Sequence, residues 1–309
     1  MVMTGVRQRE ISRVVISTAL GPAGRGIFPY TLLPSYRRLL RVVLEKGTTV
    51  LAKSATRWPR RGNFIAHNPL TWRYIQRIAG QGIVNAYGLT NKGVIACAAE
   101  MKKSLELGYR VIPNFYPEFA KGTELAIRET LESLKIYQQT LGEGFWAVEL
   151  NFSCPNSREA IDQNVAQGIA CVRRVLREFP GLFLIAKLSV VHPYEFAQEL
   201  ERLGVQALHG VNTIPYGIVF PADRYPPSPL ADVGGGGVSG GPAWQAARNY
   251  NAGLRRAVRL FLIMGCGVSS AENVQEYLDL GADAVSICTL VLRQPRVAAQ
   301  VLAGSNHRG

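Results

Sequence analysis

The sequence predicts an α/β fold in which eight parallel strands, each followed by a helix, close into a (β/α)8 barrel, the TIM barrel. Strand-like and helix-like stretches alternate from one end of the chain to the other. The strand-like runs are continuously apolar, which is typical of parallel strands covered by helices. The length of 309 residues suits one barrel domain spanning residues 1–309.

The strands are predicted from short β-branched or apolar runs, which begin with VVIS and TTVLA and end with LFLIM and AVSI. In chain order these runs occupy residues 14–17, 48–52, 110–113, 147–151, 183–188, 207–212, 260–264 and 284–287. The helices are predicted from amphipathic stretches such as SYRRLLRVVLE, where apolar residues recur every three or four positions. They occupy residues 35–45, 93–107, 125–141, 160–177, 193–203, 243–258, 271–280 and 295–302.

A doubly wound parallel sheet is the alternative fold. No GxGxxG motif stands in the turn between the first strand and its helix, which disfavours a dinucleotide-binding sheet of that kind. Residues 58–90 are too long for an ordinary connection between a strand and a helix. We expect this insert to form a lid or small hairpin over the carboxyl-terminal face of the barrel.

The composition excludes several classes of protein but leaves the meaning of the charge open. Apolar residues make up 47% of the chain, enough for a core, so a disordered, collagen-like or disulfide-scaffold protein is excluded. Lys and Arg number 35 and Asp and Glu 22, so the formal net charge is +13. Only eight of these cations are Lys. Such a balance fits nucleic acid or anionic substrates as well as a generally basic protein.

The five cysteines do not form a metal-binding pattern. They are scattered through apolar contexts without a CxxC pair, which fits neither a zinc site nor an iron–sulfur cluster. We therefore expect no metal and a reduced, cytoplasmic setting. The amino-terminal residues carry charges where a signal peptide would need an apolar run, and no stretch is long enough to span a membrane.

Two lysines stand at the ends of predicted strands. Lys53 ends the second strand and Lys187 lies in the fifth, within FLIAKLSV. Burying an ammonium group without a partner is costly, and each lysine alone could instead reach solvent. Since catalytic residues of barrels lie at the carboxyl ends of strands, the pair favours a shared anionic or electron-rich ligand.

Amide side chains gather at the same predicted rim. Asn151 and Asn156 flank the end of the fourth strand in NFSCPNS, Asn212 follows the sixth strand, and Asn85 lies in the insert. An amide donates and accepts hydrogen bonds together, which suits the ring amides of a planar heterocycle. Each of these residues alone is equally typical of a turn. Cys154 lies among them in a loop, where a thiol can act as a nucleophile or an acid–base group.

Glycine-rich turns follow the last strands. GGGGVSGG precedes the sixth predicted helix, GCGVSS follows the seventh strand, and ICT ends the eighth. Turns of this kind before helices commonly bind phosphate in barrels, through backbone N–H groups and the helix dipole. A flexible loop is the alternative reading of a glycine run alone.

Taken in order, NFSCPNS, AKLS, NT, GGVSGG, GCGVSSAEN and GADAVSICT resemble the class 1 dihydroorotate dehydrogenases and the related pyrimidine-reducing domain of dihydropyrimidine dehydrogenases. The similarity extends from about residue 14 to residue 294, and NxSCPN is its most specific element. The resemblance implies an FMN-dependent (β/α)8 barrel.

The resemblance also implies roles for individual residues. Cys154 matches the catalytic base, and Lys53 matches a lysine that contacts both flavin and substrate. The residues implied to bind the pyrimidine substrate are Asn85, Asn151, Asn156, Asn212 and Thr213. Those implied to bind the cofactor are Lys53, Ser54, Lys187, Asn212, Gly240, Gly241, Cys266, Gly267, Cys288 and Thr289. Lys187 matches the lysine near the flavin pyrimidine edge, where a cation stabilises the reduced flavin.

The implied reaction is the oxidation of dihydroorotate to orotate in pyrimidine biosynthesis. Cys154 would remove the C5 proton while a hydride passes from C6 to flavin N5. The sequence names no electron acceptor. Class 1 relatives are homodimers, or pair with an iron–sulfur/FAD subunit when they use NAD, so the resemblance implies a homo-oligomer or such a partner.

Three features depart from the family pattern. Cys266 and Cys288 stand where glycine is usual, so a Cβ there crowds the phosphate or requires a φ that other residues avoid. The loop after NFSCPNS lacks the usual glycine-rich extension, which leaves a related dihydropyrimidine open as substrate. Residues 17–26 match the family's flavin turn only loosely.

Two other functions compete with this one. A tRNA dihydrouridine synthase would explain the positive charge, but its HGR element is absent and no room remains for an RNA-binding extension. Nucleic acid is therefore not expected, and the excess arginines are interpreted as solvated helix faces. The two departures from glycine suggest the other competitor, a flavin-binding barrel without catalytic activity.

Overall fold

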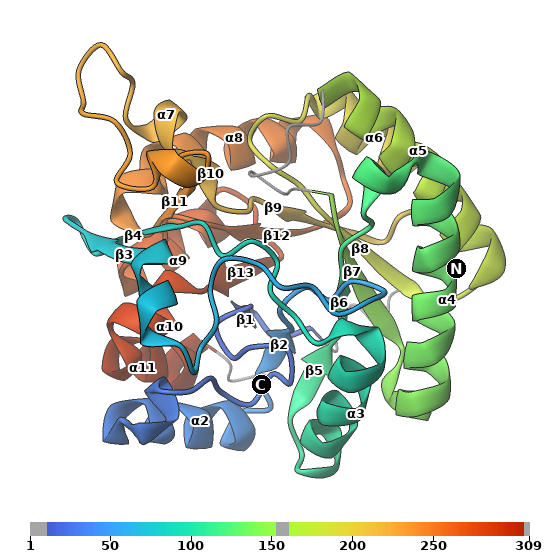
Figure 1. Cartoon of the computed structure of the whole chain (residues 1–309), viewed down its shortest axis with the longest axis horizontal. Coiled ribbons are helices and arrows are strands. Elements are labelled where there is room, and N and C mark those ends of the chain that lie inside the picture. The colour runs from blue at the N-terminus through green and yellow to red at the C-terminus, as the bar shows by residue number, and fades with distance from the viewer. Residues whose placement is uncertain (1–10, 153–160, 306–309) are drawn as a thin grey trace.

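A computed structural model describes residues 11–152 and 161–305, and it is a parallel barrel surrounded by helices (Figure 1). The strands follow the order β5-β2-β1-β13-β12-β9-β8-β7-β6. The two end members, β5 (Arg110–Ile112) and β6 (Asn114–Phe115), are consecutive pieces of one strand interrupted at Pro113. Proline has no N–H to donate, but its carbonyl still accepts from Glu149 N at 2.8 Å. The nine pieces therefore occupy eight positions and close the ring.

The predicted (β/α)8 barrel is confirmed. The remaining barrel strands are β1 (Val14–Ser17), β2 (Thr49–Leu51), β7 (Ala147–Asn151), β8 (Phe183–Lys187), β9 (Ala207–Gly210), β12 (Phe261–Gly265) and β13 (Ala284–Ile287). All lie within two residues of the predicted bounds, and every pairing between them is parallel.

In the part of the chain that the structure describes, the outer layer consists of eight helices of nine residues or more, each at a predicted place. They are α2 (Pro34–Glu45), α3 (Gly93–Glu106), α4 (Thr123–Leu141), α5 (Ile161–Glu178), α6 (Tyr194–Leu203), α8 (Trp244–Ala257), α9 (Ala271–Asp279) and α11 (Pro295–Ser305). In α2 the buried residues are Tyr36, Leu39 and Val43, whose spacing of three and four places them on one face. The short helices α7 (Tyr216–Val219) and α10 (Thr289–Arg293) lie in connections.

The inside of the barrel has an apolar layer and a polar layer. The apolar layer is buried and consists of Val15, Leu51, Ile112, Ala147, Ile185, Ala207, Ile263 and Ala284. Side chains on a strand point to the same side every second residue. Two positions further along each strand, toward its carboxyl end, stand Ser17, Lys53, Asn114, Glu149, Lys187, His209, Gly265 and Ser286. The interior therefore changes from hydrocarbon to polar groups just below the face where barrels carry their sites.

The insert at residues 58–90 forms the expected small hairpin. Its strands, β3 (Ile75–Ile78) and β4 (Gly82–Asn85), pair in antiparallel fashion. A second pair, β10 (Ile214–Pro215) and β11 (Gly237–Ser239), adds to β4 and completes a sheet with the order β10-β11-β4-β3. This second pair was not predicted. It joins the loop after β9 to the insert, so the lid is held from two distant parts of the chain.

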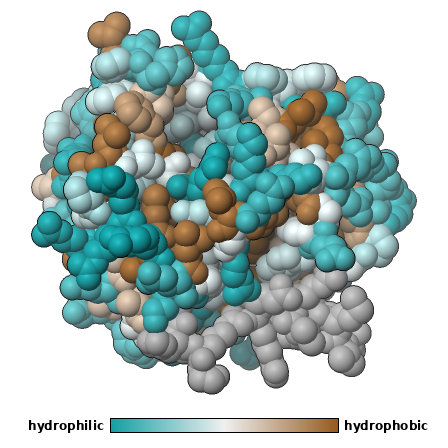
Figure 2. Space-filling view, turned by 90° about the horizontal axis from the view of Figure 1, so that it is seen from below, coloured by the Kyte–Doolittle hydropathy of each residue, from teal (hydrophilic) through white to brown (hydrophobic). Residues whose placement is uncertain are grey.

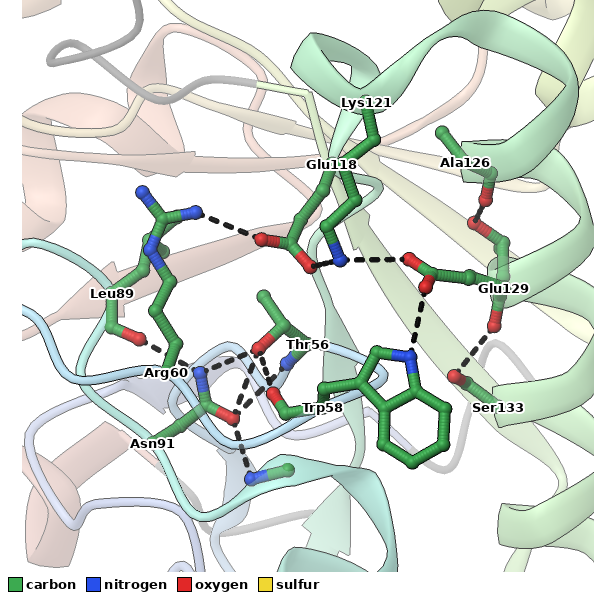
Figure 3. A network of polar contacts seen from close by, with 12 residues as sticks. Thr56, Trp58, Arg60, Leu89, Asn91, Glu118, Lys121, Ala126, Glu129 and Ser133 are labelled. Atoms are coloured by element: carbon green, nitrogen blue, oxygen red, sulfur yellow. Dashed lines mark hydrogen bonds and ion pairs between the residues drawn. The ribbon is translucent and has the colours of Figure 1, made fainter.

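A polar network fixes the base of the insert to α4 (Figure 3). Trp58 Nε1 donates to Glu129 Oε1 at 3.0 Å, and the Lys121 ammonium lies between Glu118 and Glu129, at 2.7 and 3.1 Å. Arg60 pairs with Glu118 at 2.9 Å. These contacts connect the start of the insert to the barrel wall through side chains from three elements.

The outer surface is mixed in character. Figure 2 shows apolar patches surrounded by hydrophilic side chains on one face of the molecule. The exposed large apolar side chains include Phe28, Leu32 and Leu33, which precede α2 in the sequence. Within the described residues, no helix combines the length and apolar character that crossing a membrane requires.

Candidate active site

A cavity of about 190 Å³ lies at the carboxyl ends of the barrel strands, beneath the insert. The strand ends provide its floor, and the hairpin provides a wall through Ile75, Ile83 and Tyr87. Most of the predicted site residues line it: Lys53, Ser54, Asn85, Asn151, Lys187, Asn212, Thr213, Cys266, Gly267, Cys288 and Thr289. Residues from seven separate segments of the sequence thus meet at one cavity. Their assigned roles toward substrate and cofactor remain predictions.

Two predicted cofactor residues, Gly240 and Gly241, lie beside the cavity and not on its wall. Gly240 has a φ of +78°, and a Cβ there would lie 2.4 Å from the backbone oxygen of Gln81. A Cβ on Gly241 would lie 2.3 Å from Gly80 O. Both glycines therefore let the segment after β11 pack against the hairpin turn. Cys154 and Asn156, the predicted base and one substrate amide, lie outside the described residues.

Cys266, which stands where the family usually has glycine, adopts a left-handed backbone conformation. Its φ is +67°, in the left-handed region that residues with a Cβ avoid. Burial raises the pKa of its thiol to about 12, so the thiol is protonated at neutral pH. Cys288 has a negative φ, −135°, with ψ −66°, and its Sγ lies 3.4 Å from Thr18 Oγ1. Of the two cysteines at glycine positions, Cys266 is therefore the one that lies in the left-handed region.

The amide side chains on the wall are oriented by neighbouring groups. Asn151 Nδ2 donates to Ser54 Oγ at 2.9 Å, which connects the ends of β7 and β2. Asn85 Nδ2 donates to Gly237 O at 3.3 Å, across the β4–β11 pair. Asn212 Oδ1 accepts from Thr213 N at 2.9 Å. Each of these three amides is thus oriented by a hydrogen bond to a neighbouring protein group.

Sequence reasoning missed Glu149, His209 and Ser286 of the polar layer, of which His209 and Ser286 line the cavity. Glu149 and His209 are buried and joined through Oε2 and Nδ1 at 2.5 Å, and His209 Nε2 lies 2.7 Å from Ser286 Oγ. Lys187 Nζ donates to Ser17 Oγ at 3.2 Å and lies 3.9 Å from Glu149 Oε1. The signal was present in the sequence, since these residues stand two positions after apolar interior residues.

The charges of this layer follow from its contacts. Burial raises the pKa of Glu149, but His209 and Lys187 more than offset it and hold that pKa below its usual value. Burial, with the nearby ammonium of Lys187, lowers the pKa of His209 despite the adjacent carboxylate. At neutral pH the glutamate is therefore ionised and the histidine neutral. An ionised carboxylate only accepts, so His209 carries its proton on Nδ1 and accepts from Ser286 at Nε2.

The sequence that builds this site matches a known family. The sequence model described as dihydroorotate dehydrogenase matches residues 39–308. The chain belongs to the dihydroorotate dehydrogenase family. Members of this family are oxidoreductases that use flavin, and the resemblance to its class 1 branch is confirmed.

The chain is similar to relatives named as dihydroorotate dehydrogenase A and as dihydroorotate dehydrogenase B. The catalytic subunit of dihydroorotate dehydrogenase B (NAD(+)) from Thermotoga maritima is 27% identical over 288 residues, covering 91% of this chain and 92% of that protein. Dihydroorotate dehydrogenase A (fumarate) from Limosilactobacillus reuteri is 30% identical over 264 residues, covering 83% and 79%. The B-type catalytic subunit of Porphyromonas gingivalis is 28% identical over 277 residues, covering 86% and 79%.

Proposed function

We propose that this dihydroorotate dehydrogenase family member oxidises dihydroorotate to orotate with FMN as its cofactor. One observation carries the proposal: Lys53, Asn85, Asn151, Lys187 and Asn212 come from five separate segments and line one cavity. Two cationic groups and three amides are the groups that an anionic pyrimidine and the ring of a flavin require. The family of the chain supports the same reaction.

The residues present fit a flavin mononucleotide. Lys187 is a buried cation whose ammonium contacts a hydroxyl on the cavity wall, suited to the electron-rich edge of the ring. Gly267, with φ +79°, and Thr289 follow β12 and β13, and both line the cavity. Their backbone N–H groups and the hydroxyl are suitable donors for a phosphate. We assign the ring to Lys53, Ser54, Lys187 and Asn212, and the phosphate to the turns around Gly240, Gly267 and Thr289.

The chain's own residues would orient the substrate and move one proton. The bound flavin would supply a hydride acceptor, N5, for the hydrogen at C6 of the substrate. Cys154 would take the C5 proton as base. Asn85, Asn151, Asn156 and Asn212, with Thr213, would hold the pyrimidine ring, and Lys53 would balance the negative charge of the substrate. Hydrogen bonds to the ring amides fix which face of the substrate meets the base.

The reductive half-reaction tests this proposal directly. The purified protein should be yellow with a flavin spectrum, and dihydroorotate should bleach it without oxygen, whereas dihydrouracil should not. Bleaching by dihydrouracil alone would assign the related dihydropyrimidine reaction. Bound flavin that no dihydropyrimidine reduces would contradict the proposal and support a non-catalytic barrel.

The assignment of Cys154 is tested separately. Cys154→Ser should slow bleaching at neutral pH by about 10²-fold or more, because a hydroxyl is a far weaker base than a thiolate. Cys97→Ser is the matched control, since Cys97 is buried in α3 and does not line the cavity. Unchanged kinetics in the Cys154 variant would refute its role as base.

We further propose that the enzyme acts as an oligomer. Relatives carry names that specify fumarate or NAD(+), and the NAD(+) type is named as a catalytic subunit. The exposed Phe28, Leu32 and Leu33 are available for a contact with another copy or with an iron–sulfur/FAD subunit. Light scattering of the purified chain, with reoxidation of the reduced flavin by fumarate or by NAD⁺, tests both points. A monomer reoxidised by neither would contradict them.

A further inference from the structure

The buried Glu149 carboxylate and the Lys187 ammonium form an ion pair that is not closed by a hydrogen bond. The shortest distance between them, from Lys187 Nζ to Glu149 Oε1, is 3.9 Å, beyond hydrogen-bond length. Both side chains are almost completely excluded from solvent, with exposures of 5% and 0%. An ion pair in such surroundings is normally closed and hydrogen-bonded, so something else must satisfy the carboxylate.

Two neutral donors occupy the carboxylate oxygens. Asn114 Nδ2 donates to Glu149 Oε1, and His209 Nδ1 donates to Glu149 Oε2 at 2.5 Å. His209 is itself held at its other nitrogen by Ser286. Each oxygen thus has a neutral donor, and the ammonium of Lys187 bonds to Ser17 Oγ, a residue on the cavity wall.

The fold makes space for this arrangement. His209 and Ser286 stand on β9 and β13, with β12 between them. On β12 the residue of the polar layer is Gly265, where a Cβ would lie 1.9 Å from Ser286 Oγ and 3.3 Å from His209 Nε2. Only glycine at this position allows the histidine and the serine to meet across the intervening strand.

We propose that His209 is a positioning residue of the cofactor site, which holds Glu149 and thereby keeps the positive charge of Lys187 directed at the cavity. The inference rests on the proposed function, because the charge is taken to act on a bound flavin. A flavin gains negative charge on reduction, and a nearby cation not neutralised by a hydrogen-bonded carboxylate favours that reduction. Without the histidine, Glu149 Oε2 would accept a hydrogen bond from the Lys187 ammonium.

The test is the reduction potential of the bound flavin, measured against reference dyes without any substrate. His209→Leu removes the donor, so we expect the equilibrium constant for reduction to fall about tenfold, ~30 mV for a two-electron couple. His209→Gln keeps an N–H donor and should restore the constant to within about threefold. Glu149→Gln removes the negative charge and should move the potential in the opposite direction to His209→Leu.

Shifts of the reduction potential in opposite directions distinguish a positioning role of His209 from a general loss of packing. Loss of packing would shift the His209→Leu and Glu149→Gln proteins in the same direction, and that result would overturn the proposal, as would no shift in either. His192→Gln is the matched control. This histidine is also buried, bonds to Asn164 and Ser189, and does not line the cavity, so its variant should keep the wild-type potential.

A second measurement needs no cofactor and no activity. Nitrogen NMR of histidine-labelled apoprotein should show His209 neutral at neutral pH, with the proton on Nδ1. A cationic ring, or a proton on Nε2, would overturn the proposal. If flavin binds but dihydroorotate does not reduce it, the proposed function fails while the potentials remain measurable. If flavin does not bind at all, the NMR result still decides the donor assignment.

Discussion

The Lys53 ammonium lies 3.6 Å from the centroid of the Tyr87 ring. Lys53 follows the end of β2, and Tyr87 follows β4 in the insert, so this cation–π contact joins the barrel floor to the lid across the cavity. Burial raises the pKa of Tyr87 to about 12, so its hydroxyl remains protonated and the ring acts as a neutral surface for the cation.

Removing the Tyr87 ring should weaken the binding of the anionic ligand. In Tyr87→Leu the ammonium of Lys53 loses a contact of about 1 kcal/mol, and we expect the Kd of orotate to rise about fivefold. Tyr87→Phe keeps the ring and should bind like the wild type. Titration of the flavin absorbance with orotate measures both. Equal loss in the two variants would show that the hydroxyl, and not the ring, is the important group.

In the polar network that joins the insert to α4, Glu129 should contribute more to the free energy of unfolding than Arg60. Glu129 is 10% exposed and accepts from Trp58 while pairing with Lys121, so Glu129→Ala should lower the free energy of unfolding by about 1–2 kcal/mol. Arg60 is 44% exposed, and Arg60→Ala should cost less than about 0.5 kcal/mol, as for other surface ion pairs. Urea denaturation of both variants tests the ranking, and a reversed order would contradict it.

The barrel could be predicted from the sequence because each of its strands and helices has a local sequence pattern. An apolar run such as VVIS or AVSI and an amphipathic stretch such as that of α2 are each defined by neighbouring residues. β10 and β11 gave no such signal. They are two and three residues long, contain Pro and Gly, and exist because distant β4 pairs with them.

The site could be predicted in part, for a similar reason. Residues at strand ends, such as Lys53 and Asn212, stand where a barrel gathers polar groups, and they line the cavity. Glu149 and His209 stand inside strands that were interpreted as apolar, so their partners could not be inferred without the ring of strands. Only the closed barrel places β7, β9 and β13 around one point.

Gly240 should not tolerate a side chain. Gly240→Ala adds a Cβ 2.4 Å from Gln81 O and at a φ of +78°, so the turn must shift, and we expect a loss of about 2 kcal/mol in stability. If this turn binds the phosphate, FMN affinity should fall as well. Gly217→Ala is the control, because a Cβ there meets nothing within 4 Å. Thermal unfolding and FMN fluorescence titration give the two readouts, and a neutral Gly240→Ala would contradict the requirement.

Cys266 should be a strained position whose native residue is not optimal. Cys266→Gly removes the Cβ from a backbone at φ +67°, whereas Cys266→Ala keeps it. Both lose the thiol, so their difference isolates the backbone. We expect the glycine variant to be more stable than the alanine variant by about 1 kcal/mol, the reverse of the order in ordinary helix or strand positions. A more stable alanine variant would show that the conformation is unstrained.

His192 should make the protein less stable as the pH falls below neutral. Burial lowers its pKa to about 4, against roughly 6.5 in an unfolded chain, while the ring bonds to Ser189 N and Asn164 Oδ1. Between these values the unfolded state binds more protons than the folded state, so the stabilisation is complete above pH ~6.5 and is lost toward pH ~4, by up to about 3 kcal/mol. His192→Gln should flatten the dependence of unfolding free energy on pH in this window. His209, whose pKa is also lowered, contributes to the slope that remains, as does the buried Glu149 carboxylate toward the acid end of the window. His67 is exposed, so His67→Gln should keep the full wild-type slope, and a His192 variant that also keeps it would refute the assignment.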